Sequence, residues 1–118
     1  MKILIIEDEY KLADAISEIL KKEKFTTKII TNGEEGENEA LTNIYDLILL
    51  DEVMDPLDGV TVMKKFKDIR NFKTNVILLT RNNEYEYNEE YLKYGFSGYL
   101  LKPISKDKLF EIIDKYLK

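Results

Sequence analysis

Four short, continuous runs of apolar residues divide this sequence: Ile3–Ile6, Leu47–Leu50, Val76–Leu79 and Tyr99–Leu101. The runs are mostly branched and do not alternate with polar residues, which is typical of strands buried on both faces of a parallel sheet. A weaker fifth strand is predicted at Thr26–Thr31, which is rich in β-branched residues. The strands begin roughly 20–30 residues apart, so each interval has room for one crossover helix.

Apolar residues with helical spacing lie between these runs and predict five helices. The second, at about 34–42, is weak because Gly36 lies inside it, and the fourth, at about 85–94, is rich in tyrosine. Ser105 is predicted to cap the last helix, with Asp107 in its first turn. The apolar faces of the first, third and last helices consist of Leu12, Ile16, Ile19 and Leu20; Val62, Met63, Phe66 and Ile69; and Leu109, Ile112, Ile113, Tyr116 and Leu117. This alternation of strands and helices predicts one doubly wound α/β domain over residues 1–118.

Tyrosines gather near the fourth predicted helix, at Tyr85, Tyr87, Tyr91, Tyr94 and Tyr99. Three of them, Tyr87, Tyr91 and Tyr94, fit one helical face, which favours a role in filling the core. Tyrosine is also enriched in protein interfaces, so an outer aromatic surface for a partner is the alternative. The two interpretations are compatible if the helix presents one face to the sheet and another to a partner.

Composition excludes several chemistries. The 118 residues include no histidine and no cysteine, so the chain has no Ser-His-Asp or Cys-His nucleophile, no thiolate or imidazole metal site and no disulfide. The net charge of −5 argues against nucleic-acid binding by this domain itself. No apolar run approaches the roughly 20 residues of a membrane span. We therefore expect a cytoplasmic protein without membrane contact.

Polar residues follow the predicted strands at the points where these end. Glu7 and Asp8 follow the first strand, Asp51 the third, Thr80 the fourth and Lys102 the fifth. Each alone is typical of an ordinary loop residue or helix cap. Because the carboxyl ends of parallel strands share one edge, these side chains are expected to meet there, where ligands bind in such sheets.

Carboxylates so close together repel one another, by about 4 kcal/mol for two unit charges 4 Å apart at an effective dielectric of 20. They therefore recruit a cation or take up protons. With no soft ligand in the chain, the expected cation is hard: Mg²⁺, with Mn²⁺ as the alternative. A metal beside a lysine and a hydroxyl is suited to phosphoryl transfer, in which a central aspartate can be the nucleophile.

These residues resemble the receiver domain of two-component response regulators along the whole chain. The similarity implies a flavodoxin-like (βα)5 fold with a five-stranded parallel sheet in the order 2-1-3-4-5. The motifs that carry it are Ile3-Leu4-Ile5-Ile6-Glu7-Asp8-Glu9, Asp46-Leu47-Ile48-Leu49-Leu50-Asp51, Asp58-Gly59, Val76-Ile77-Leu78-Leu79-Thr80 and Gly98-Tyr99-Leu100-Leu101-Lys102-Pro103.

The resemblance implies a role for each residue of the expected site. Asp51 corresponds to the phosphoacceptor, and Glu7, Asp8, Asp51 and the backbone carbonyl of Val53 correspond to the Mg²⁺ ligands. Thr80 corresponds to the hydroxyl that turns toward the phosphoryl group.

Three further positions follow from the same resemblance. Lys102 corresponds to the lysine that pairs with a phosphoryl oxygen. Its peptide bond to Pro103 is expected to be cis. Tyr99 corresponds to an aromatic residue that moves inward after phosphorylation.

The implied activity is that of a signalling switch rather than an enzyme, limited to self-phosphorylation and self-dephosphorylation. A sensor histidine kinase or a phosphotransfer protein would supply the phosphoryl group. The surface of the last two helices and the strand between them would then change shape to control an effector domain or partner. A homodimer through this surface is possible, and DNA would be bound only through an effector domain outside this chain.

Two departures from the family pattern affect the site. Pro56 lies five residues after Asp51 instead of four, so the loop there is expected to differ, and the carbonyl of Met54 could replace that of Val53. Arg81 stands where a small residue is usual. This gating candidate is expected to slow phosphorylation by small donors and hydrolysis, or to pair with phosphate.

The opening residues, Glu7-Asp8-Glu9 and Lys11-Leu12, resemble the winged-helix transcriptional regulators most. However, Ser97-Gly98 replaces that subfamily's acidic pair, and the last helix lacks its arginine. Two other functions are alternatives. The first is a receiver-like scaffold that dimerises without phosphorylation, which Pro56 and Arg81 favour slightly. The second is an FMN binder, which the acidic loop after the first strand disfavours.

Overall fold

The computed structural model describes all 118 residues and contains a five-stranded parallel sheet in the order β2-β1-β3-β4-β5. The predicted fold class and strand order are therefore confirmed. The predicted strand positions agree with those observed to within a residue or two. The strands are β1 (Lys2–Ile6), β2 (Thr26–Ile30), β3 (Leu47–Asp51), β4 (Asn75–Thr80) and β5 (Gly98–Leu101).

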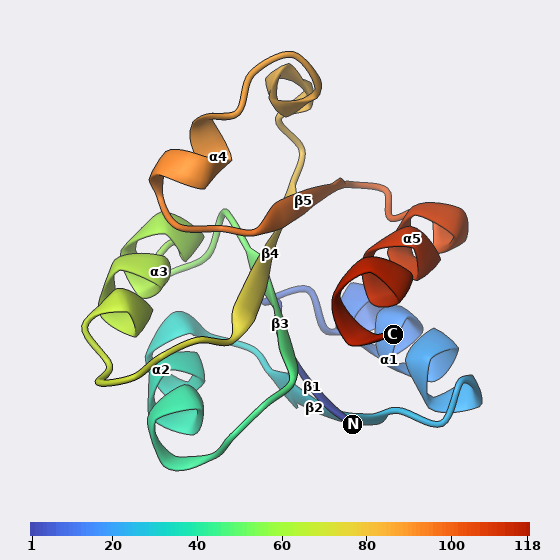
Figure 1. Cartoon of the computed structure of the whole chain (residues 1–118), viewed down its shortest axis with the longest axis horizontal. Coiled ribbons are helices and arrows are strands. Elements are labelled where there is room, and N and C mark those ends of the chain that lie inside the picture. Colours follow the sequence, from blue (N-terminus) through green and yellow to red (C-terminus); the bar gives the residue numbers. More distant parts are fainter.

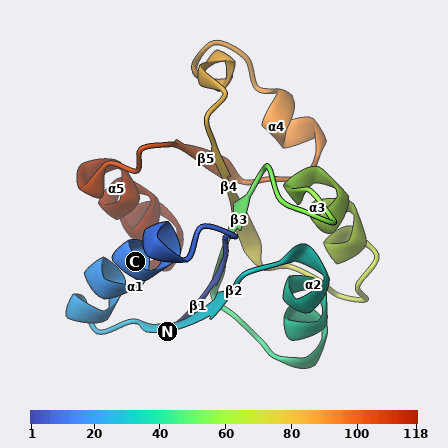
Figure 2. The same ribbon diagram turned by 180° about the vertical axis from the view of Figure 1, so that it is seen from behind.

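Helices cover both faces of the sheet (Figures 1 and 2). One face is covered by α1 (Tyr10–Lys22) and α5 (Lys106–Leu117). The other is covered by α2 (Gly33–Thr42), α3 (Gly59–Lys67) and the short α4 (Glu90–Lys93). None of these helices combines the length and the apolar character that crossing a membrane requires.

The core consists of two apolar layers, because successive side chains of a strand point to opposite faces of the sheet. In β1, Ile3 and Ile5 pack with α1 and α5, whereas Leu4 and Ile6 pack with α3 and the segment that leads to α4. All four residues are fully buried. The continuous apolar runs thus form strands that are covered on both faces, as their pattern predicts.

Local sequence explains where the helices begin. Asn32, Asp58 and Ser105 cap α2, α3 and α5, and each accepts a hydrogen bond from a backbone N–H three residues on. The predicted Ser105 cap is therefore confirmed. Gly36 lies within α2 because a Cβ there would meet the side chain of Ile6 at 2.7 Å. This close packing of helix on strand accounts for a glycine that weakens the helix in isolation.

The single helix predicted over residues 85–94 is wrong. The structure has a 3₁₀ turn, η1 (Asn83–Glu86), and then α4. The Asn88 side chain accepts a hydrogen bond from the backbone N–H of Glu90 at 3.1 Å, which starts a new helix. The predicted tyrosine face is confirmed for Tyr91 and Tyr94, which pack against the core, and is wrong for Tyr87, which is 87% exposed, whereas Tyr85 is buried. In one continuous helix, Tyr85 and Tyr91 would point to different sides, so both can face the core only because the helix is interrupted between them.

Candidate functional site

Strand register brings the predicted polar residues to one edge of the sheet. Ile6 lies opposite Leu50 in the β1–β3 pair. The next residues along the two chains, Glu7 and Asp51, are therefore neighbours at the same edge of the sheet. Thr80 is the last residue of β4 and lies opposite Leu101 of β5. Four of the five strands therefore end at a common edge with a carboxylate, a hydroxyl or an ammonium group.

Lys102 lies between two buried carboxylates. Its Nζ is 2.7 Å from Oε1 of Glu7 and donates a hydrogen bond to Oδ1 of Asp51 at 2.8 Å. The side chains of Glu7, Asp51 and Lys102 are 0%, 3% and 6% exposed. A buried charge is tolerated only when it is paired, so these three groups depend on one another. The Lys102–Pro103 peptide bond is cis.

Burial dominates the proton affinities of this cluster. It raises the pKa of Glu7 to about 7, and the ammonium of Lys102 offsets only part of that increase. Burial also raises the pKa of Asp51, against the same opposing effect of Lys102. Burial by itself would lower the pKa of Lys102, but the two carboxylates reverse this, and its pKa is raised. Lys102 thus stays charged, whereas Glu7 and Asp51 both bind a proton more readily than a free carboxyl group does.

The carboxylates fit a hard divalent cation. Glu7, Asp8 and Asp51 each offer an oxygen, and these oxygens lie within 4.8 Å of one another. Oδ2 of Asp51 is buried and accepts no hydrogen bond, and the only close polar partner of the buried Oε1 of Glu7 is the Lys102 ammonium, at 2.7 Å. Buried polar atoms without partners are rare, so Oδ2 of Asp51, beside the exposed Asp8, leaves lone pairs for a ligand. Oxygen-only donors with one ligand open to water are the set that Mg²⁺ prefers.

Thr80 lies at this edge, but its hydroxyl is directed to another residue. It is 1% exposed and donates a hydrogen bond to Oε1 of Glu52 at 2.6 Å. Oε2 of Glu52 accepts a second hydrogen bond, at 3.0 Å, from the hydroxyl of Tyr85. The sequence reasoning missed Glu52. The available signal was an acidic residue directly after the last residue of a fully buried strand.

The loop after Asp51 contains Pro56, the residue whose position differs from the family pattern. The Asp55–Pro56 peptide bond is cis, and Met54 is buried. Val53 is 75% exposed, and its N–H donates to Oδ1 of Asp51 at 3.4 Å. No contact in the structure tests whether the carbonyl of Val53 or that of Met54 is a metal ligand.

A glycine fixes where this loop ends. The N–H of Gly59 donates to the backbone oxygen of Glu52 at 2.8 Å. A Cβ at Gly59 would overlap the carbonyl oxygen of Asp51. Asp58 caps α3 directly before it. The Asp58-Gly59 pair therefore holds the start of α3 against the end of β3.

Two predicted residues lie at the border of the site. Arg81, directly after Thr80, has its Nη2 3.3 Å from Oε1 of Glu9, and both side chains are largely exposed. This ion pair joins the segments that follow β4 and β1. Tyr99 is half-buried, with its ring centroid 5.0 Å from that of Tyr91 and 6.1 Å from that of Tyr85.

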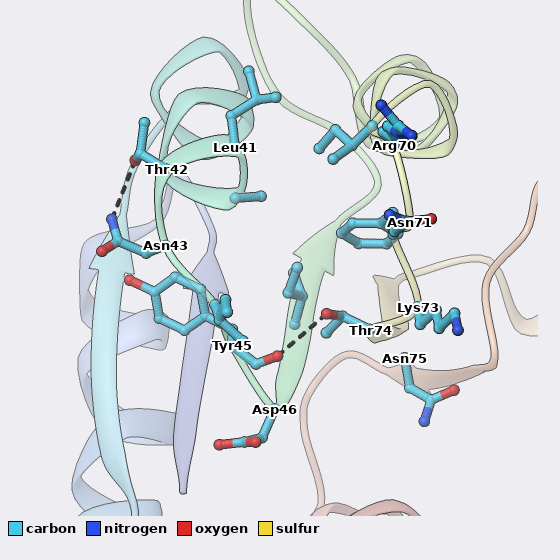
Figure 3. A pocket seen from close by; sticks show the side chains of 15 residues that line it. Leu41, Thr42, Asn43, Tyr45, Asp46, Arg70, Asn71, Lys73, Thr74 and Asn75 are labelled. Atoms are coloured by element: carbon cyan, nitrogen blue, oxygen red, sulfur yellow. Dashed lines mark hydrogen bonds between the residues drawn. The ribbon is translucent and has the colours of Figure 1, made fainter.

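A hollow of about 560 Å³ lies at the opposite edge of the sheet, between the segments that precede β3 and β4 (Figure 3). Its polar groups bind one another: Thr74 donates to the carbonyl of Tyr45 at 3.2 Å, and Asn43 donates to Thr42 at 3.2 Å. Asp46 accepts a hydrogen bond from the backbone N–H of Lys2. We therefore assign the chemistry to the carboxylate cluster at the other edge of the sheet.

Sequence comparison gives one family. Residues 3–114 match the family model described as "Response regulator receiver domain". The chain is 33% identical over 117 residues to "Response regulator ArlR" of Staphylococcus saprophyticus, covering 99% of this chain and 52% of that protein. It is 30% identical over 109 residues to "Transcriptional regulatory protein DltR" of Streptococcus agalactiae, covering 92% of this chain and 48% of that protein. The chain thus spans about half the length of these relatives.

Solved structures agree with the sequence matches. The receiver domain of the Francisella response regulator 1452 superposes with a TM-score of 0.89 at 32% identity, covering 98% of this chain and 94% of that one. The receiver domain of the Pseudomonas aeruginosa sensor histidine kinase PA1611 gives a TM-score of 0.86 at 25% identity, covering 98% and 95%. The latter structure has a magnesium ion coordinated in its active-site cleft.

Proposed function

Because this chain belongs to the response regulator receiver domain family, we propose that it accepts a phosphoryl group on Asp51 and acts as a signalling switch. The donor is the phosphohistidine of a sensor histidine kinase or of a phosphotransfer protein. The observation that carries this proposal is the position of Lys102, whose Nζ lies 2.7 Å and 2.8 Å from the buried carboxylates of Glu7 and Asp51.

The reaction exchanges one bond to phosphorus for another. A carboxylate oxygen of Asp51 forms the new P–O bond as the P–N bond to the donor imidazole breaks, and the bonding electrons leave with that nitrogen. Lys102 offsets the negative charge of the phosphoryl oxygens, which is the main requirement of such a transfer. It also keeps Asp51 ionised, since the carboxylate and not the acid is the nucleophile.

Glu7, Asp8 and Asp51 would hold Mg²⁺ through oxygen atoms, with Mn²⁺ as a substitute. The bound metal supplies positive charge that stabilises the phosphoryl oxygens during transfer. A fourth protein ligand, the carbonyl of Val53 or of Met54, completes the proposed set. Asp51 already presents a buried oxygen, Oδ2, without a hydrogen bond, which supports this assignment.

The phosphoryl group would then change a distant surface. Thr80 turns its hydroxyl toward the new oxygens, Tyr99 moves toward the space that it leaves, and the α4-β5-α5 surface changes shape. That surface controls an effector domain, a partner or a second copy of this chain. DNA would be reached only through an effector domain, and the cytoplasm is the compartment that this role requires.

Incubation with acetyl phosphate tests the proposal. With Mg²⁺, the intact mass of the wild type is expected to rise by one phosphoryl group, and EDTA is expected to prevent this. Asp51→Asn should show no increase, whereas Asp55→Asn, which alters an exposed carboxylate in the next loop, should behave as the wild type. No gain in the wild type, or an equal gain in Asp51→Asn, would refute phosphorylation at this residue.

A second candidate is a receiver-like scaffold that dimerises without phosphorylation. The contact of Thr80 with Glu52 and the ion pair of Arg81 with Glu9 favour it, because both oppose entry of a phosphoryl group. The scaffold predicts the same oligomeric state for the wild type and Asp51→Asn, with or without acetyl phosphate. Light scattering of the four samples separates the two functions.

A further inference from the structure

Glu52 is next to Asp51 in the chain and is hydrogen-bonded to Thr80, the hydroxyl residue of the site. Its backbone N–H donates to the carbonyl of Leu79 at 2.9 Å. Its two carboxylate oxygens bind different elements: Oε1 accepts from Thr80 at 2.6 Å, and Oε2 accepts from Tyr85 at 3.0 Å. The carboxylate thus joins the end of β4 to the 3₁₀ turn that follows it.

The Thr80 hydroxyl has a single proton, so it can donate to only one acceptor at a time. Here the proton goes to Glu52, and the Thr80 oxygen accepts a hydrogen bond from the backbone N–H of Asn82 at 2.9 Å. A hydrogen bond to an ionised acceptor is shorter and stronger than one between neutral groups. A phosphoryl oxygen on Asp51 and the carboxylate of Glu52 therefore compete for the same proton.

Tyr85 extends this arrangement to the tyrosine cluster. It is buried, and its ring centroid lies 5.8 Å from that of Tyr91 and 6.1 Å from that of Tyr99. Burial and the adjacent carboxylate of Glu52 raise the pKa of Tyr85 to about 12, so its hydroxyl stays protonated and able to donate. Glu52 thereby holds two side chains in place: Thr80, and Tyr85, whose ring packs against that of Tyr99.

We propose that Glu52 is a positioning residue that holds the Thr80 hydroxyl away from Asp51 and so opposes the phosphorylated state. This inference rests on the proposed phosphoacceptor function. Two effects act in the same direction. Thr80 must give up a charge-assisted hydrogen bond before it can donate to a phosphoryl oxygen. The carboxylate that it leaves is then repelled by the new negative charge on the neighbouring residue.

Three variants test this role. Glu52→Leu removes the acceptor and the charge, Glu52→Gln keeps an acceptor oxygen but removes the charge, and Glu84→Gln is the control. Glu84 is an exposed acid of η1 whose carboxylate has no hydrogen bond in the structure. At fixed acetyl phosphate and Mg²⁺, we expect the ratio of phosphorylated to unphosphorylated protein to rise about tenfold in Glu52→Leu and less in Glu52→Gln. The control should match the wild type.

Nuclear magnetic resonance adds a readout that a purely structural role would not change. The backbone N–H of Asn82 donates to the Thr80 oxygen, so its chemical shift depends on where that oxygen lies. In unphosphorylated Glu52→Leu, the Asn82 amide resonance should move toward the position that it has in the phosphorylated wild type. A slowly exchanging Thr80 hydroxyl proton is expected in the wild type without any phosphate and should disappear in Glu52→Leu.

The outcomes separate this inference from the function on which it rests. Equal phosphorylation of both Glu52 variants and the wild type, or an Asn82 resonance that does not move in that direction, overturns the role of Glu52 alone. A wild type that takes no phosphoryl group overturns the proposed function and the competition with it. The hydroxyl proton reports the hydrogen bond in either case, and its absence from the wild type overturns the inference directly.

Discussion

The single ammonium group of Lys102 determines how the buried carboxylates behave. It contacts Glu7 and Asp51, but it cannot neutralise both, and burial still raises the pKa of each. It was predictable from the sequence that these residues meet, because each lies at or directly after the end of a strand. The hydrogen bonds of Thr80 were not, because they depend on the χ angles of Glu52 and on the burial of Tyr85.

Glu7 makes stability depend on pH. Its pKa is raised from 4.5 to about 7, so the folded state binds the proton more tightly, and the stabilisation is fully present below pH 4.5 and lost as pH rises to about 7. In metal-free buffer, the free energy of unfolding should fall over this range by on the order of 1–3 kcal/mol more in the wild type than in Glu7→Gln. Denaturant titrations at several pH values measure this. Glu84→Gln is the control, and equal slopes in Glu7→Gln and the wild type would contradict the prediction.

Arg81 should slow access to the site through its ion pair with Glu9. Because this pair is largely exposed and worth less than about 1 kcal/mol, Arg81→Ala should accelerate phosphorylation by acetyl phosphate, and hydrolysis of the product, by about 2–5-fold. Arg70→Ala, which removes an exposed arginine near the opposite edge of the sheet, is the matched control. Unchanged rates in Arg81→Ala would rule out a gating role.

Apolar runs and helix caps are the sequence features that predicted most of the strands and helices. Strands β1, β3 and β4 were predictable because each contains a continuous buried run, and α5 was predictable because the Ser105 cap and the apolar face of the helix agree. The largely unburied β2 was the weakest prediction. The segment over residues 83–93 was not, because a tertiary contact of Tyr85 outweighs the local helical spacing of the tyrosines. Local propensity is only a weak guide where such contacts form.

The tyrosines near α4 should differ sharply in their effect on stability. Tyr91 packs against the rings of Tyr85 and Tyr99, so Tyr91→Ala is expected to lower the free energy of unfolding by about 1–3 kcal/mol. Tyr87 is 87% exposed, and Tyr87→Ala should cost less than about 0.5 kcal/mol. Chemical denaturation followed by circular dichroism compares the two. Similar losses would show that Tyr87 also packs in the core.

At the scale of the whole molecule, the fold creates the site by bringing together residues from distant parts of the chain. Glu7, Asp51, Thr80 and Lys102 meet because parallel strands all end at one edge. The strand order follows from the family resemblance, and the meeting of the strand ends follows from parallel pairing alone. We propose that this arrangement at the edge of the sheet makes Asp51 a phosphoacceptor.

Chemical mapping of the phosphorylated residue tests that claim most directly. After incubation with acetyl phosphate and Mg²⁺, borohydride reduces an aspartyl phosphate to homoserine, which peptide mass spectrometry locates in the chain. The account predicts homoserine at position 51 and at no other aspartate. An unmodified Asp51, or reduction at Asp8 or another carboxylate instead, would contradict it.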